Sequence, residues 1–188
     1  MPLHDVPPMV ATMSPGAEVR QANVEDAEAI AEVHVASWRG AYTGLLPAAV
    51  LDAHTVQRRT ARWREELAAR GQTTWLAVEA DAVVGFASVG SSRDPDTGPG
   101  VGELYAIYVT PAAWDKAVGH ALHEAAVSTL ASEYEGAVLW VLDGNARARR
   151  FYERHGWRLD GAAKQEARGD AILNEVRYRR PLGPAVAT

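Results

Sequence analysis

Residues 102–122 narrow the choice of fold more than any other part of the chain, because they run from a strand through a tight turn into a helix. The apolar run 104–109 is short, partly β-branched and aromatic, and Thr110-Pro111 stops it, a pattern that predicts a buried strand. Apolar side chains then recur at helical spacing over 117–134. A helix that starts directly beyond a strand points its free N–H groups at whatever lies there, so the segment predicts an anion site suited to phosphate.

The composition is that of one globular domain and excludes several classes of protein. With 188 residues, of which 47% are hydrophobic, the chain is long enough to bury a full core. Its net charge of −5, from 24 acidic and 19 basic residues, argues against nucleic acid as a partner and is compatible with a cationic amine substrate. It has no cysteine, which excludes disulfides, thiolate metal sites and a cysteine nucleophile.

Nothing in the sequence predicts export or membrane insertion. No apolar run approaches the roughly 18 residues of a membrane span. The N-terminal residues also lack the basic and apolar regions of a signal peptide. We therefore expect a cytoplasmic protein with no membrane partner.

The order of predicted elements indicates one α/β domain at 18–182, between a disordered tail at 1–17 and a C-terminal tail at 183–188. The loop 91–100 is long for a hairpin connection, and such loops often move. The strand at 138–142 is wholly apolar, which predicts burial on both faces. Helices are predicted after Asn23, at 48–53, 56–69 and 117–134, and after Asn145. The other strands are predicted at 19–22, 75–79, 83–89, 104–109, 157–159 and 172–179.

Two segments resemble the motifs of the GCN5-related N-acetyltransferase (GNAT) family. Motif A of that family follows a strand ending V-x-P with (Q/R)-x-x-G-x-(G/A), which here falls on 114–119. Motif B reads N-x-x-A-x-x-F-Y-E-x-x-G-(F/W), and this chain matches it in full with Asn145, Ala148, Phe151, Tyr152, Glu153, Gly156 and Trp157. The resemblance covers about residues 18–182. It implies a single-domain GNAT-like fold, with a mixed, mostly antiparallel central sheet flanked by helices on both faces.

The resemblance also implies a co-substrate. In the family, the backbone amides of motif A hold the pyrophosphate of acetyl-CoA, the acyl donor, and no metal takes part. A backbone amide of the central strand near Tyr108 or Val109 would hold the oxyanion of the transition state. The cofactor-binding residues implied in this chain are Ile107, Tyr108, Val109, Trp114, Lys116, Ala117, Val118, Gly119, His120, Asn145, Ala148 and Tyr152.

Motif A departs from the family pattern at three positions. Trp114 stands where Gln or Arg is usual, and Ala117 replaces the first glycine, which is tolerable if its φ is helical. Asp115 stands where many relatives have glycine. Two like charges about 6 Å apart repel by roughly 3 kcal/mol at an effective dielectric constant near 20. The penalty is smaller if Asp115 points to solvent or caps the helix.

Tyr152 is the candidate general acid. In the family, the tyrosine at this place in motif B protonates the departing CoA thiolate. A phenol has an ordinary pKa near 10, so it is protonated at neutral pH and can donate. The alternative is that Tyr152 is only a core aromatic residue beside Phe151.

Glu103 is the candidate general base and contacts the substrate in this interpretation. It precedes the central strand, where many family members place a catalytic glutamate. The alternative is a solvated carboxylate at the end of the strand. His34, His120, His123 and His155 are rivals for the role, because neutral imidazole suits proton removal.

The acceptor side of the site is predicted from the stretch 37–47, which resembles the wall of the acceptor pocket in one GNAT subgroup. Trp38 and Tyr42 are the candidate substrate-binding residues, or else they only pack between helices. Asn145 either contacts the pantetheine arm or only caps its helix. The arginines within 58–64 form either a solvated helix face or a patch for the CoA 3′-phosphate.

The sequence thus predicts an acetyl-CoA-dependent N-acetyltransferase that acetylates a primary amine of a small molecule or peptide by direct attack in a ternary complex. The alternative function is a catalytically weak GNAT-fold protein that acts as an acyl-CoA sensor or interaction module. Fold does not choose among acceptors. Because the family often dimerises, a homodimer is neither supported nor excluded.

Overall fold

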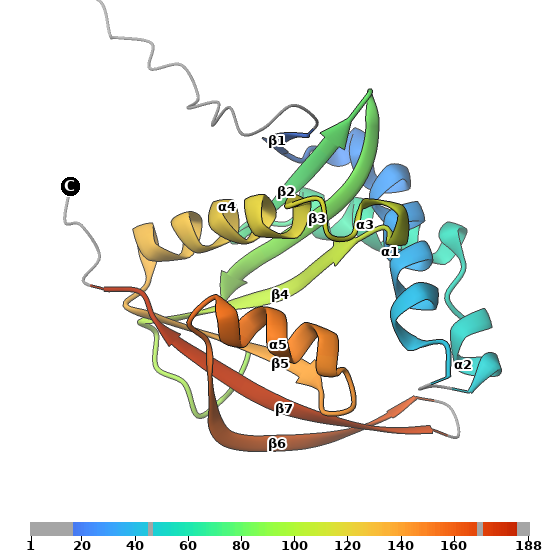
Figure 1. Cartoon of the computed structure of the whole chain (residues 1–188). Coiled ribbons are helices and arrows are strands. Elements are labelled where there is room, and N and C mark those ends of the chain that lie inside the picture. The colour runs from blue at the N-terminus through green and yellow to red at the C-terminus, as the bar shows by residue number, and fades with distance from the viewer. Residues whose placement is uncertain (1–16, 45–46, 169–170, 184–188) are drawn as a thin grey trace, which may run out of the picture.

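The computed structural model describes residues 17–44, 47–168 and 171–183 (Figure 1). Apart from Ala17 and Gly183, the two predicted tails lie outside the described residues. Within them, one seven-stranded sheet has the order β1-β2-β3-β4-β5-β7-β6, and only the β4–β5 pair is parallel. The strands are β1 (Glu18–Gln21), β2 (Gln72–Glu79), β3 (Ala82–Ser91), β4 (Val101–Val109), β5 (Gly136–Leu142), β6 (Arg158–Arg168) and β7 (Ala171–Pro181).

Helices cover both faces of the sheet, as predicted (Figure 1). One hydrophobic cluster joins α1 and α3 to β2 and β3, and a second joins α4 and α5 to the opposite face. Asn23 and Asp26 form a capping box at the start of the short 3₁₀ helix 24–26, which leads directly into α1. The helices are α1 (Ala27–Tyr42), α2 (Ala48–Asp52), α3 (Val56–Ala68), α4 (Val118–Glu133) and α5 (Ala146–Arg154), with short 3₁₀ helices η1 (Val24–Asp26) and η2 (Pro111–Ala113).

The divergence of β4 from β5 is the feature that creates the site. These two strands pair only from Val101 to Glu103, opposite 136–138. On its other side, β4 continues to pair with β3 as far as Val109. A register shift between Ser88 and Val89 marks an irregularity of the kind that re-aims side chains. Most of one edge of β4 is therefore left without a neighbouring strand.

Several regions differ from the sequence-based expectation. Strand β6 extends to Arg168, well beyond the predicted 157–159, because it pairs with β7. Strand β4 begins at Val101, so Glu103 lies inside the strand and not before it.

Burial on both faces of β5 holds for its aliphatic residues but not for Trp140, whose side chain is only partly buried. Its indole Nε1–H donates to Asp94 in the β3–β4 loop at 2.9 Å. That loop, expected to move, is thus tied to the sheet.

Among the described residues, none of the helices could span a membrane.

Candidate active site

A cavity of about 1090 Å³ occupies the gap between β4 and β5 and extends to α1, α4 and α5. Most of the predicted site residues line it. Two do not: the Lys116 ammonium lies 3.9 Å from Glu79, and Val118 is 2% exposed in the core. The predicted residues in the lining are Trp38, Tyr42, Glu103, Ile107, Tyr108, Val109, Trp114, Ala117, Gly119, His120, Asn145, Ala148 and Tyr152.

The backbone of β4 offers hydrogen-bonding groups to this cavity. The N–H of Thr110 donates to Val84 of β3 at 2.9 Å. Because peptide groups alternate sides along a strand, the N–H groups of Val109 and Ile107 face the gap, while that of Tyr108 faces β3. The Trp114 indole, which donates to the Val109 carbonyl at 2.8 Å, agrees with this assignment. The strand therefore presents amides where an oxyanion would need donors.

The N-terminus of α4 opens on the same cavity. Ala117 is its N-cap, and no side chain caps the helix there. The first helical N–H groups, which have no intrahelical partner, include that of the cavity-lining Gly119. The positive end of the 16-residue helix adds to these donors, so this end of the cavity suits an anion.

The unusual residues of motif A adopt backbone conformations that favour glycine. Asp115 and Ala117 have φ of 62° and 63°. Ala117 therefore does not have the helical φ under which an alanine would be tolerated at this position. The left-handed conformations cost of order 1–3 kcal/mol each. Asp115 points to solvent with its side chain 88% exposed, and it pairs with Arg147 at 3.2 Å. Arg147 in turn lies 4.1 Å above the ring of Trp114, so a cation partly offsets the carboxylate beside the anion site.

Tyr152 lies on α5 and is 8% exposed. It belongs to the cluster under α4 and α5, and it also lines the cavity, so packing and access to a ligand coexist. Burial raises the pKa of its phenol, and the neighbouring Tyr42 adds to the rise. The hydroxyl is therefore protonated at neutral pH. The side chain of Asn145 accepts a hydrogen bond from the Ala148 N–H at 3.1 Å, which confirms its predicted role as a cap.

Glu103 is buried, with 3% exposure, so it is not the solvated carboxylate of the alternative interpretation. Its Oε1 accepts from Nη2 of Arg93 at 2.5 Å. Its Oε2 accepts from Nε and from the backbone N–H of the same residue at 3.2 and 2.9 Å. The carboxylate thus sits at the closed end of the β4–β5 gap in a two-point ion pair.

Two of the rival histidines are held neutral by their surroundings. Burial, reinforced by Arg59, lowers the pKa of His34 to about 3, and burial lowers that of His123 to about 3. The Trp63 indole donates to Nδ1 of His34 at 3.3 Å, so the other nitrogen of the neutral ring carries the proton. The protonated nitrogen of this ring can only donate, which does not suit a base.

The other two histidines lie at the α4–α5 end of the cavity, beside the anion site. Nδ1 of His155 donates to the Phe151 carbonyl at 2.7 Å, since a carbonyl only accepts. Its Nε2 then accepts from Nδ1 of His120 at 2.9 Å. These contacts hold the two rings together beside the start of α4.

The acceptor side carries buried polar atoms without partners. Trp38 and Tyr42 line it with ring centroids 4.4 Å apart. Among the described residues, the hydroxyl of Ser37 and the Trp38 Nε1 are buried and have no hydrogen-bond partner. Of the predicted arginines, Arg59 and Arg62 reach the lining. The Ser37 hydroxyl and the Trp38 Nε1 both belong to residues that line the cavity.

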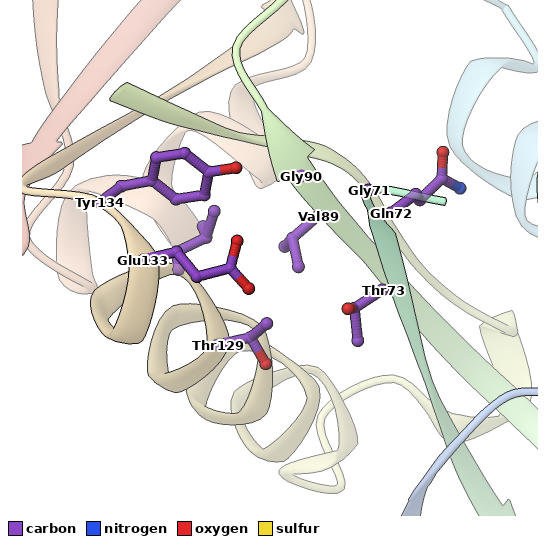
Figure 2. Close-up of a pocket in the computed structure, with 9 residues that line it drawn as sticks. Gly71, Gln72, Thr73, Val89, Gly90, Thr129, Glu133 and Tyr134 are labelled. Atoms are coloured by element: carbon purple, nitrogen blue, oxygen red, sulfur yellow. The ribbon is translucent and has the colours of Figure 1, made fainter. Parts of the chain in front are cut away.

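A second pocket, of about 170 Å³, lies between the start of β2, the end of β3 and the last turns of α4 (Figure 2). Thr129, Glu133 and Tyr134 contribute to it from the end of α4. None of the predicted site residues lines this pocket. The predicted site residues that line a pocket therefore all lie in the larger cavity.

The family assignment follows from this site and from comparison with known proteins. Residues 30–157 match the Acetyltransferase (GNAT) family. The chain therefore belongs to the GNAT acetyltransferase family, and its enzyme class is that of the N-acetyltransferases. It is 33% identical over 129 residues to the uncharacterised N-acetyltransferase YuaI of Bacillus subtilis, an alignment that covers 68% of this chain and 72% of YuaI.

Solved structures share the fold. The PaiA N-acetyltransferase of Thermoplasma acidophilum, in complex with coenzyme A, superposes with a TM-score of 0.68 at 18% identity, covering 90% of this chain and 99% of that one. The YncA structure of Salmonella typhimurium, which contains its cofactor acetyl-CoA, superposes with a TM-score of 0.70 at 21% identity, covering 93% and 98%. The predicted GNAT-like architecture is confirmed.

Sequence reasoning did not identify Arg93 or Arg147 as parts of the site. The composition of residues 91–100 indicates only that Arg93 lies in a loop. The β3–β4 register places Gly90 opposite Glu103, which brings the start of the loop beside that carboxylate. If this strand register is assumed, the sequence predicts that Arg93 lies close to Glu103. Arg147 carries no comparable signal, because its partners Trp114 and Asp115 lie on a different element.

Proposed function

We propose that this enzyme transfers the acetyl group of acetyl-CoA directly to a primary amine within a ternary complex. The observation that carries the proposal is the gap between β4 and β5, which leads from buried Glu103 along an unpaired strand edge to the uncapped start of α4. In this arrangement, the amides at the start of α4 bind the pyrophosphate. The pantetheine arm lies along the free edge of β4, and the acceptor enters between α1 and the sheet. The CoA and acetyl-CoA complexes of PaiA and YncA support this choice of co-substrate.

The proton movements can be assigned to two side chains. Glu103 takes one proton from the acceptor ammonium through a water molecule, and the neutral amine attacks the thioester carbon. An amide of β4 at Ile107 or Val109 donates to the oxyanion that forms. The C–S bond then breaks, and Tyr152 protonates the thiolate. The second amine proton passes to Tyr152 and restores its hydroxyl, and Glu103 releases its proton to solvent, so the products are the amide, CoA thiol and one proton.

Burial of Tyr152 is compatible with this role. A phenol whose pKa is raised gives up its proton less readily. The CoA thiolate would form in the same desolvated cavity, which raises the pKa of the thiol as well. The pKa values of the phenol and of the thiol are therefore both raised, so burial does not prevent the phenol from protonating the thiolate.

Thermal unfolding with and without acetyl-CoA tests the binding part of the proposal. A ligand at 100 times its dissociation constant adds about 2.7 kcal/mol to the free energy of unfolding. For a domain of this size, the unfolding midpoint should rise by roughly 5–10 °C. About millimolar acetyl-CoA is far above the dissociation constant assumed in this calculation. An unfolding midpoint that does not rise at this concentration would contradict acetyl-CoA binding.

A double variant serves as the control for the altered loop. Asp115→Gly with Ala117→Gly removes a carboxylate and two strained conformations beside the anion site. Acetyl-CoA should raise the midpoint of this variant by at least as much as that of the unaltered protein. A smaller rise would mean that the side chains at these positions contribute to binding.

A further inference from the structure

Arg93 presents an exposed cation at the end of the cavity where Glu103 lies. It lies in the β3–β4 loop, and its guanidinium stacks 4.2 Å above the ring of Tyr105. Its partner Glu103 has a side chain only 3% exposed, whereas the side chain of Arg93 is 64% exposed. The carboxylate of this ion pair is therefore buried, whereas the guanidinium is exposed.

The guanidinium of Arg93 also has donors to spare. Of the five N–H groups of an arginine side chain, two bond to Glu103, at 3.2 and 2.5 Å. Within the described residues, the remaining edge has no hydrogen-bond acceptor, so it can bind another one. A planar guanidinium edge matches a carboxylate in shape and charge, which is why such pairs are often bidentate.

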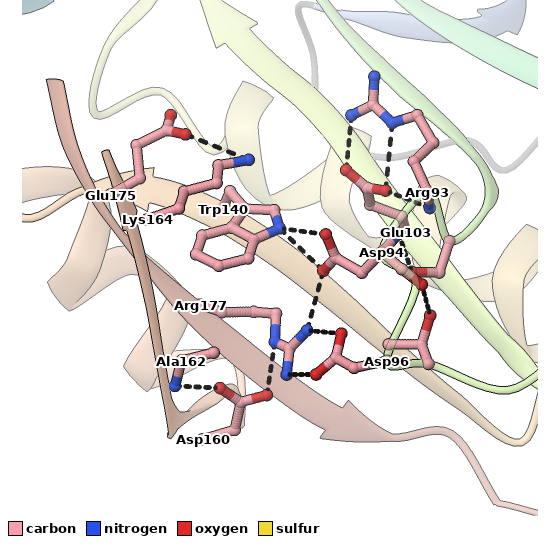
Figure 3. Close-up of polar contacts among 12 residues, drawn as sticks. Arg93, Asp94, Asp96, Glu103, Trp140, Asp160, Ala162, Lys164, Glu175 and Arg177 are labelled. Atoms are coloured by element: carbon pink, nitrogen blue, oxygen red, sulfur yellow. Dashed lines mark hydrogen bonds and ion pairs between the residues drawn. The ribbon is translucent and has the colours of Figure 1, made fainter. Parts of the chain in front are cut away.

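The loop that carries Arg93 is anchored to the sheet (Figure 3). Arg177 of β7, whose side chain is 9% exposed, pairs with Asp94 at 3.0 Å and with Asp96 at 2.7 Å. The Trp140 indole bonds to Asp94 as well, at 2.9 Å. Because Asp94 is the next residue in the chain, these contacts fix the backbone beside Arg93. A binding group that is held in place loses little freedom when its ligand arrives.

We propose that Arg93 binds a carboxylate of the acceptor, so that the acceptor is a small molecule with both a primary amine and a carboxylate. The inference rests on the proposed function. The acceptor's carboxylate takes up the open edge of Arg93 and competes with Glu103 for the guanidinium. One proton passes from the acceptor ammonium to Glu103, and the neutral amine forms the new C–N bond as the thioester C–S bond breaks. With the acceptor bound, Arg93 faces two carboxylates before this transfer, and after it only the carboxylate of the acceptor remains charged.

An acceptor without a carboxylate should be acetylated more slowly. It leaves the open edge of the Arg93 guanidinium without a charged partner. It also forfeits the charge-assisted bonds of the carboxylate. The length of the chain between amine and carboxylate decides whether both ends reach their partners, so the test must vary it.

The experiment compares the rate of thiol release from acetyl-CoA for matched pairs of free acid and primary amide. The amines are α-amino acids, β-alanine, γ-aminobutyrate and ε-aminocaproate. For at least one chain length, kcat/KM for the acid should exceed that for its amide by about 10²-fold. Arg93→Gln should bring this ratio close to one. Arg58→Gln, which removes an exposed arginine of α3 outside the cavity lining, should leave the ratio unchanged.

Three outcomes overturn the inference in distinguishable ways. Amides that react as well as acids at every chain length, or an acid preference that survives Arg93→Gln, exclude carboxylate recognition by Arg93 while acetyl transfer stands. No thiol release with any amine rejects the proposed function itself. Because Arg93→Gln leaves Glu103 buried without its partner and can prevent folding, Arg93→Lys gives a second reading: it keeps the charge but loses the planar fork, and the ratio should still fall.

Discussion

Tyr152→Phe should lower kcat by about 10²- to 10⁴-fold, the range typical of a lost general acid. The substitution removes only a hydroxyl from a side chain that is 8% exposed, so the ring and its packing remain. Binding of acetyl-CoA should hardly change, because the phosphates are held elsewhere. Steady-state thiol release measures kcat, and the acetyl-CoA-induced rise in unfolding midpoint measures binding.

A matched variant separates this effect from the general loss of a tyrosine hydroxyl. Tyr134→Phe makes the same change at the end of α4, where the side chain borders the smaller pocket. Its kcat should equal that of the unaltered enzyme. If Tyr152→Phe retained full activity, Tyr152 would be only a packing residue, as in the alternative considered from the sequence.

Stability should fall steeply as the pH drops from 7.5 to 5. His34 and His123 are buried as neutral rings with pKa values of about 3, whereas in the unfolded chain a histidine has a pKa near 6.5. The unfolded state therefore binds more protons below pH 6.5, and stability that is fully present above this value is lost as the pH falls toward 3. Each histidine should lower the free energy of unfolding by about 2 kcal/mol at pH 5, and the two together by about 4 kcal/mol.

Urea unfolding at pH 7.5, 6.5, 5.5 and about 5 measures this loss, since most carboxylates titrate lower. His34→Gln removes one of the two groups but keeps an oxygen able to accept from Trp63, which now donates to the histidine. The loss between pH 7.5 and 5 should then be roughly halved. An unfolding free energy that stays constant down to pH 5 would mean that neither ring is excluded from protonation.

The parts of the fold that could be predicted are those governed by local chemistry. Asn23 with Asp26, Asn145 and Gly156 marked where helices begin and end, and the structure has caps and a left-handed glycine at these places. The alternation of apolar runs with helical patterns predicted the order of strands and helices. The cavity likewise gathers most residues implied by the two motifs, because the motifs lie on elements that flank the same gap.

The parts that could not be predicted depend on contacts between distant segments. Arg177 meets Asp94 and Asp96 across 83 and 81 residues, and nothing local marks this pairing. The left-handed backbone at Ala117 is equally hidden, because alanine normally adopts helical φ. The ion pair of Glu103 with Arg93 follows from strand register, which a sequence pattern specifies only loosely at a long loop.

The most direct test of direct transfer is the initial-rate pattern when acetyl-CoA and an accepted amine are varied together. Attack within a ternary complex predicts double-reciprocal lines that intersect, and a protein that stays unacetylated when it is incubated with acetyl-CoA alone. Parallel lines, together with an acetylated side chain detected by intact-protein mass spectrometry, would instead show a covalent intermediate and contradict the account.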